Sequence, residues 1–85
     1  MAWIRGHSLW IRLGRESQRQ VFVVRRKLGN AVLRNRLKRR LRHICRKRPF
    51  LPRNLVVLCQ PPAIEVPFDE LERELDSLVP KLSTT

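Results

Sequence analysis

The segment GNAVLRNRLKRRLRH, residues 29–43, combines a helical hydrophobic pattern with a high density of arginine and lysine, and it contains no acidic residue. Gly29 interrupts the strand-like pattern before it, and Asn30 is a residue type favoured as a helix N-cap. The apolar residues then recur at spacings of four, four and three and form one stripe of an amphipathic helix: Leu33, Leu37, Leu41 and Ile44. The opposite stripe consists of Asn35, Arg39, Arg42 and Arg46. Pro49 predicts the end of this helix, because the residue before a proline avoids the α region.

Positive charge is concentrated in the first three quarters of the chain. The 85 residues carry a formal net charge of +12. Residues 1–64 contain seventeen basic residues and one acidic residue, whereas residues 65–85 contain two basic and six acidic residues. A chain this basic repels itself, and nucleic acid is the usual partner that relieves the repulsion.

The basic helix indicates which nucleic acid is favoured. Like charges four residues apart destabilise an isolated helix by about 0.2–0.5 kcal/mol per pair, and no acidic side chain in the segment offsets this cost. The sequence shows neither a preceding helix that would make a helix-turn-helix motif nor a zinc ligand set. A uniformly cationic helix suits recognition of the shape and backbone of structured RNA. We therefore expect an RNA partner and no DNA partner.

The rest of the chain predicts a small sheet and a second helix. A short strand is expected to begin at residues 3–4, and residues 7–13 alternate with the period of a strand. Residues 20–28 predict a strand next to it. Residues 54–60 form a nearly unbroken apolar run, which predicts a central strand covered on both faces. Residues 67–79 predict a helix whose acidic residues face solvent. One domain is expected over the whole chain, residues 1–85.

The two cysteines and the acidic residues exclude several kinds of site. Cys45 and Cys59 lie far apart without the spacing of a metal or redox motif, so neither a disulfide nor a metal site is expected. We interpret both as buried apolar residues, which favours a cytoplasmic protein. One acidic residue in the first 64 cannot supply the clustered carboxylates of a two-metal nuclease, so no catalytic side chain is predicted. No apolar run approaches the roughly 18–20 residues of a membrane span, and no membrane partner is expected.

The segment KLGNAVLRNRLKR, residues 27–39, resembles the signature block of the bacterial ribonuclease P protein subunit. That family carries the pattern Lys-hydrophobic-Gly-x-Ala-Val-x-Arg-Asn-Arg-hydrophobic-Lys-Arg at the start of its long basic helix. NLVVLCQP, residues 54–61, resembles the strand after that helix, and FDELERELDSLVPKL, residues 68–82, resembles the terminal helix. The resemblance covers roughly residues 7–82 and is strongest at residues 27–42.

The resemblance implies a fold and a function. The implied fold is an α/β (α+β) two-layer sandwich like the second domain of ribosomal protein S5, with the basic helix in a βαβ crossover and a C-terminal helix. The implied function is that of the protein subunit of ribonuclease P, a ribonucleoprotein endonuclease that removes 5′ leaders from precursor tRNA during tRNA processing. The chemistry is then expected to belong to the RNA subunit, which also holds the Mg²⁺. A small basic ribosomal protein that binds rRNA stays as the alternative, because it shares every compositional feature.

The resemblance also implies two sets of RNA-binding residues. The set expected to bind the catalytic RNA is Arg34, Asn35, Arg36, Lys38, Arg39, Arg40, Arg42 and Arg46. The set expected to lie toward the leader of precursor tRNA is Trp10, Arg12, Arg25, Arg26 and Lys27. From its position, Trp10 is either a core residue or a stacking surface for an unpaired base.

Two departures from the family pattern concern the leader site. Residues 24–27 read VRRK where the family tends to have Val-Ser-Lys-Lys. Family members also usually begin with a helix that bears aromatic residues and forms part of the leader cleft. This chain is expected to be a short version without that helix.

Overall fold

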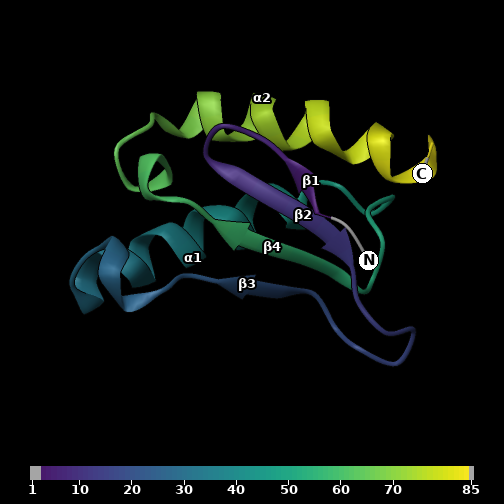
Figure 1. Cartoon of the computed structure of the whole chain (residues 1–85), viewed down its shortest axis with the longest axis horizontal. Helices are drawn as coiled ribbons and strands as arrows, with labels where there is room; N and C mark the ends of the chain where they lie inside the picture. Colours follow the sequence, from purple (N-terminus) through teal and green to yellow (C-terminus); the bar gives the residue numbers. More distant parts are fainter. Residues whose placement is uncertain (1–2, 85) are drawn as a thin grey trace.

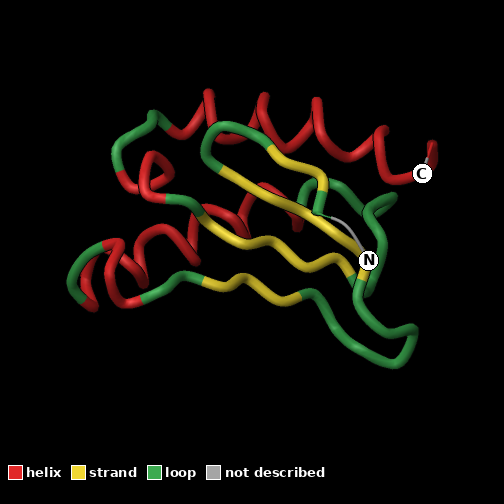
Figure 2. The backbone as a smooth tube through the Cα atoms, in the orientation of Figure 1, coloured by secondary structure: helices red, strands yellow, loops and turns green. Residues whose placement is uncertain are grey.

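The computed structural model describes residues 3–84, in which a four-stranded sheet packs against two α-helices (Figure 1). The strands are β1 (Ile4–Arg5), β2 (Leu9–Leu13), β3 (Val21–Val23) and β4 (Leu55–Cys59), and the helices are α1 (Ala31–Arg46) and α2 (Phe68–Leu78). Three short 3₁₀ turns complete the fold (Figure 2). The first, Arg26–Leu28, precedes α1; the second, Pro61–Ile64, follows β4; and the third, Val79–Thr84, extends α2.

The strands are arranged in the order β1-β2-β4-β3. β2 pairs antiparallel with β1 and β4, whereas β3 pairs parallel with β4, so β3, α1 and β4 form the expected βαβ crossover. The prediction that β4 is central is confirmed. The prediction that the strand within residues 20–28 lies next to β2 is wrong, because β4 lies between them. Asn54 holds β4 beside the end of β2: its side-chain amide donates to the Gly14 carbonyl, and its own carbonyl accepts from the Gly14 N–H.

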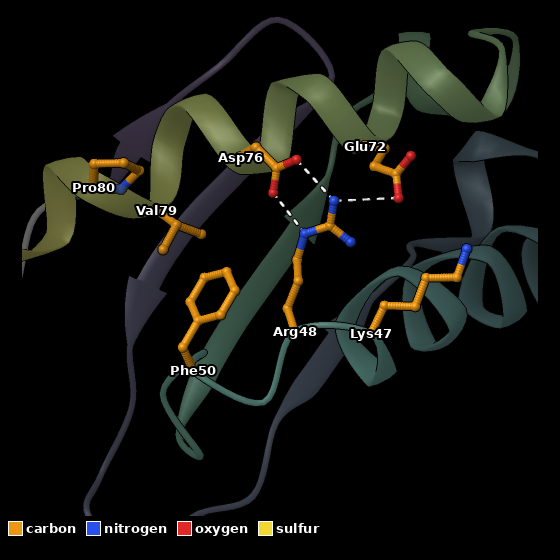
Figure 3. Close-up of a pocket in the computed structure, with 7 residues that line it drawn as sticks. All are labelled: Lys47, Arg48, Phe50, Glu72, Asp76, Val79 and Pro80. Carbon is orange, nitrogen blue, oxygen red and sulfur yellow. Dashed lines mark hydrogen bonds and ion pairs between the residues drawn. The ribbon is translucent and has the colours of Figure 1, made fainter.

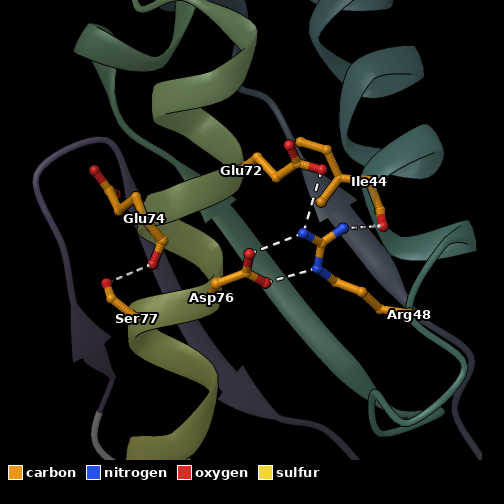
Figure 4. A network of polar contacts seen from close by, with 6 residues as sticks. All are labelled: Ile44, Arg48, Glu72, Glu74, Asp76 and Ser77. Atoms are coloured by element: carbon orange, nitrogen blue, oxygen red, sulfur yellow. Dashed lines mark hydrogen bonds and ion pairs between the residues drawn. The ribbon is translucent and has the colours of Figure 1, made fainter.

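Both helices cover the same face of the sheet, as Figure 4 shows with the strands behind them. One continuous core joins side chains from β2, β4 and the two helices; its fully or almost fully buried members include Leu9, Ile11, Val57, Cys59, Leu37, Leu41, Ile44, Leu71, Leu75 and Leu78. Because alternate residues of a strand point to opposite faces, Val56 and Leu58 face away from this core. Both helices of the described residues lie on the core side of β4, so the predicted cover of its second face comes only from neighbouring side chains. Val56 is only 4% exposed because its cross-strand neighbours Arg12 and Val21 flank it.

The basic helix begins where the sequence predicts. The Asn30 side-chain oxygen accepts a hydrogen bond from the Leu33 N–H at 2.9 Å, which is the expected N-cap. α1 ends at Arg46, shortly before Pro49. Its predicted apolar stripe is buried except at Leu33, the first of the four residues. Leu33 is 36% exposed, because it lies in the first turn and packs over Gly29 instead of entering the core.

The strand predicted over residues 20–28 is shorter than expected. β3 ends at Val23, and residues 26–28 form a 3₁₀ turn in which the Leu28 N–H donates to the Arg25 carbonyl. Leu28 is buried, so this turn anchors the chain on the core before α1 begins. The chain changes direction here because α1 must cross the face of the sheet between two parallel strands.

The cysteines are free and buried, as predicted. Burial raises the pKa of the Cys45 thiol to about 11 and that of the Cys59 thiol to about 12, although Arg48 and Lys38, respectively, act in the opposite direction. Both thiols are therefore protonated near neutral pH and behave as small apolar side chains.

The prediction that the acidic residues of α2 face solvent is wrong for Glu72 and Glu74, which are half-buried, and right for Asp76, which is exposed although it forms an ion pair. Glu72 and Asp76 pair with Arg48, which follows α1. One oxygen of Glu74 accepts hydrogen bonds from the backbone N–H groups of Ser8 (2.8 Å) and Leu9 (2.6 Å) at the start of β2. The turn before β2 needs a glycine at position 6, because a Cβ there would lie 2.7 Å from the backbone carbonyl oxygen of Leu9 and 2.7 Å from that carboxylate oxygen.

Replacing Glu74 with alanine should destabilise the fold. The two N–H groups lose a charged acceptor, which is expected to lower the free energy of unfolding by about 2–3 kcal/mol. For a domain of this size that corresponds to a fall in Tm on the order of 10 °C, measured by circular dichroism. The matched control is Glu70→Ala on the exposed side of the same helix, for which we expect a loss below about 1 kcal/mol. Equal melting curves for the two variants would contradict the role assigned to Glu74.

Candidate RNA-binding surfaces

The outward face of α1 carries the largest group of predicted RNA-binding residues. Asn35, Arg36, Arg39, Arg42 and Arg46 are exposed, and Arg34, Lys38 and Arg40 are half-buried along the flanks of the helix. At 1.5 Å per residue, the exposed group extends over roughly 16 Å of a single rigid element. The structure thus places all eight residues on one helix, with five of them on the side away from the core.

These side chains have no internal counter-charge. Within residues 3–84, none of the basic side chains of α1 forms an ion pair with an acidic side chain. The fold also places no acidic residue in the first turn of α1, so the helix depends on Asn30 for its cap. Basic side chains without a carboxylate partner, arranged on a rigid helix, are suited to the phosphate oxygens of a folded RNA.

Arg34 and Arg48 differ from the exposed arginines because the protein holds each in place. The Nε–H of Arg34 donates to the Gly29 carbonyl at 3.2 Å, which fixes the guanidinium near the start of the helix. Arg48 donates from two nitrogens to the Asp76 carboxylate (2.6 and 2.8 Å), lies 3.2 Å from Glu72, and also donates to the Ile44 carbonyl (Figure 4). The hydrogen bond to Asp76 is the main cause that raises the pKa of Arg48 above its usual range. Arg48 therefore joins α1 to α2 and lies outside the exposed row of basic residues on α1.

The face of the sheet opposite the helices forms a second surface, hereafter the open face. Trp10 and Arg12 project from β2 on this side, next to Leu58 and Val56 of β4. Trp10 is half-buried and is not a member of the core, so the interpretation of Trp10 as a core residue is wrong. The ring is thus partly exposed on a surface that also carries cations.

Arginines lie against both tryptophans of the open face. The guanidinium carbon of Arg5 lies 4.8 Å from the centre of the Trp10 ring, and that of Arg12 lies 4.9 Å from the centre of the Trp3 ring. Both distances are those of cation–π pairs. The sequence analysis missed Arg5 as a site residue. Arg5 lies opposite Trp10 in the β1–β2 pair, and this strand register cannot be read from the sequence.

Residues 25–27 form the corner where the open face meets the start of α1. The Arg25 guanidinium donates to the Gln60 side-chain oxygen at 3.4 Å, and Arg25 continues the row of β3 residues that face the open side. Arg26 and Lys27 are exposed in the 3₁₀ turn. The two sets predicted from the sequence therefore occupy adjoining surfaces of one molecule.

Metal-binding clusters and membrane-spanning helices are both absent from the described residues. Residues 3–84 contain no group of three or more His, Cys, Asp or Glu side chains that could hold a metal ion, so the residues present do not fit a protein-bound Mg²⁺ site. No helix in this part of the chain is long and apolar enough to cross a bilayer.

Comparison with known proteins gives consistent similarities. The family model for ribonuclease P matches residues 5–83. The ribonuclease P protein component of Acidothermus cellulolyticus is 45% identical over 67 residues, which cover 75% of this chain and 56% of that protein. The corresponding protein of Kocuria rhizophila is 48% identical over 62 residues, which cover 68% of this chain and 54% of the relative. The chain spans about half the length of the curated relatives it matches.

Solved structures show the same similarity in three dimensions. The ribonuclease P protein from Thermotoga maritima superposes with a TM-score of 0.75 at 27% identity and covers 94% of this chain and 82% of its own. The ribonuclease P protein from Staphylococcus aureus superposes with a TM-score of 0.70 at 23% identity, over 94% of this chain and 79% of that one, and shows the shared fold. The predicted two-layer α+β fold is confirmed. These similarities do not favour the alternative of a ribosomal protein.

Proposed function

The chain belongs to the ribonuclease P protein family, and from that premise we propose that it acts as the protein subunit of ribonuclease P. In this role it binds the catalytic RNA and precursor tRNA and assists the endonucleolytic removal of the 5′ leader. The cationic face of α1, which lacks any internal counter-charge within residues 3–84, is the observation that carries this proposal. Cleavage of precursor tRNA by the chain reconstituted with a bacterial ribonuclease P RNA tests it.

The proposed division of labour follows from the residues present. The described side chains form no metal-binding cluster, so we assign the Mg²⁺ and the hydrolytic chemistry to the RNA subunit. Bound Mg²⁺ would supply the charge stabilisation and the activated water that phosphodiester cleavage requires. The protein contributes fixed cations that screen the repulsion between phosphates of the two RNAs.

We assign one RNA to each surface. The catalytic RNA is assigned to α1, because planar guanidinium groups on a rigid helix suit phosphates of fixed geometry; the residues are Arg34, Asn35, Arg36, Lys38, Arg39, Arg40, Arg42 and Arg46. The leader is assigned to the open face and its corner, because tryptophans flanked by arginines suit an unpaired strand; the residues are Trp10, Arg12, Arg25, Arg26 and Lys27. Arg5 and Trp3 extend this second surface.

We place the protein in the cytoplasm. Cys45 and Cys59 are free and buried, which suits a reducing compartment. The proposed partners are RNA molecules of that compartment, with no DNA and no membrane among them.

Replacing Trp10 with alanine tests the leader assignment. The loss of one stacking surface is expected to cost about 1–3 kcal/mol per base, so the preference for precursor over mature tRNA should fall by roughly tenfold. Because Trp10 lies outside the core, the melting temperature should change little. Binding of the reconstituted enzyme to the two tRNAs, with a thermal melt of the same variant, measures both effects.

The control for that experiment is Trp10→Phe, which retains an aromatic ring at the same position. It should keep most of the preference for precursor tRNA. An unchanged preference in Trp10→Ala would mean that the leader does not cross this part of the open face.

A further inference from the structure

One large apolar side chain is exposed away from both proposed RNA surfaces. Phe50 is 73% exposed and lies in the loop between α1 and β4. The loop itself is firmly held: Leu51 is buried, and its N–H donates to the Arg48 carbonyl at 3.1 Å. Arg48 in turn is bonded to α2 through Asp76. The Phe50 ring is therefore presented to solvent from a fixed backbone, which suits the binding of a ligand without an ordering cost.

A pocket opens beside this ring (Figure 3). Its volume is about 550 Å³, within the range of small-molecule sites and large enough for a nucleobase. Phe50, Val79 and Pro80 form an apolar side, and Arg48 projects between them and Lys47 toward the two carboxylates of α2. The pocket thus offers an aromatic surface next to hydrogen-bonding groups, the combination that a base requires.

The net charge of the whole chain, and not that of the pocket lining, favours an anionic strand. Inside the pocket, Arg48 pairs with both Glu72 and Asp76, and together with Lys47 the lining holds two cations and two carboxylates. Lys47 is exposed at the rim and forms no ion pair within the described residues. The chain as a whole carries +12, which opposes the approach of a second copy and attracts a polyanion.

We infer that this pocket binds an unpaired nucleobase of an RNA strand, with the base stacked on Phe50 and the phosphates of the strand near Lys47. Carboxylate oxygens of Glu72 and Asp76 can accept from the edge of the base, and Arg48 can donate to it. The inference rests on the proposed function in so far as it requires an RNA-binding protein. It extends the RNA contact beyond the C-terminal end of α1, at least about 18 Å along the helix axis from Asn35.

The test compares Phe50→Ala, Phe50→Trp and Lys47→Gln in binding to two probes, a short single-stranded oligouridylate and a blunt-ended RNA duplex. Phe50→Ala should bind the single strand roughly tenfold more weakly with an unchanged salt dependence, because stacking is lost but no cation is removed. Its duplex binding should match wild type. Phe50→Trp should restore single-strand binding. Lys47→Gln should instead reduce the slope of log affinity against log salt by about 0.7.

A photo-crosslink locates the contact directly. An oligouridylate that carries one 4-thiouridine should crosslink to the peptide that contains Phe50, and the crosslink should be absent from the duplex probe. Wild-type affinity of Phe50→Ala for both probes, or equal weakening for both, would overturn the inference. A change from dimer to monomer in Phe50→Ala, measured by sedimentation, would also overturn it by assigning the pocket to a second copy. Failure of precursor tRNA cleavage would count against the proposed function and leave these binding results unaffected.

Discussion

Precursor tRNA should stay intact when the purified chain and Mg²⁺ are the only components, and it should lose its 5′ leader once a bacterial ribonuclease P RNA is added. The described residues contain no cluster of acidic, histidine or cysteine side chains that could hold a catalytic metal. The chain instead offers cations without internal partners along α1, which can bring two polyanions together. The measurement is the release of labelled leader, resolved by gel electrophoresis.

The Mg²⁺ requirement supplies a second readout of the same experiment. Protein cations take over part of the screening that free Mg²⁺ otherwise performs, so adding the chain should lower the Mg²⁺ concentration for half-maximal cleavage by several-fold. RNA alone at each Mg²⁺ concentration is the control. Cleavage by the protein alone, with repeated purification and nuclease controls, would show that the chemistry has been assigned to the wrong subunit.

Removing two charges from the exposed face of α1 should have the largest effect on RNA affinity. In the double variant Arg36→Gln/Arg39→Gln, two charge-assisted hydrogen bonds to phosphate are lost, at about 1.5–3 kcal/mol each. The two losses sum to about 3–6 kcal/mol, so affinity for the catalytic RNA should fall by about 10²- to 10⁴-fold. The slope of log affinity against log salt should fall by about 2. Both side chains are exposed and form no ion pair within the described residues, so the thermal melt should match wild type.

The matched control removes the same charge elsewhere. Arg15 and Arg19 are exposed in the loop between β2 and β3, and Arg15→Gln/Arg19→Gln has the same net charge as the α1 variant. Its affinity should stay within a few-fold of wild type. Arg36→Lys/Arg39→Lys should keep the salt dependence but lose part of the affinity, because lysine lacks the planar donor fork. Equal losses in the α1 and loop variants would mean that net charge alone attracts the RNA.

Local patterns in the sequence were enough to predict the two helices and to recognise the signature block. The N-cap at Asn30, the stripe of Leu37, Leu41 and Ile44, and the central position of β4 all agree with the structure. Each depends on residues within a few positions of one another, either through helical periodicity or through an unbroken apolar run. The Arg-Asn-Arg block within residues 27–39 likewise identified the family from a short stretch of chain.

The tertiary structure alone decided the order of the strands and the exposure of the open face. The position of β4 between β2 and β3 depends on contacts such as that between Gly14 and Asn54, 40 residues apart. Both helices then pack on one face, which leaves Trp10 on the other. A strand pattern shows that its two faces differ, but which face is covered depends on where distant helices pack.

The same reason applies to individual charged residues. In the sequence, Arg46 and Arg48 are neighbours in one basic run, yet the structure leaves Arg46 exposed and pairs Arg48 with Asp76, 28 residues away. Glu74 has the pattern of a solvent-exposed helical residue, yet it binds the backbone of Ser8, 66 residues away. A side chain's charge is readable from the sequence, but its partner is not, because folding brings together groups that the chain separates by tens of residues.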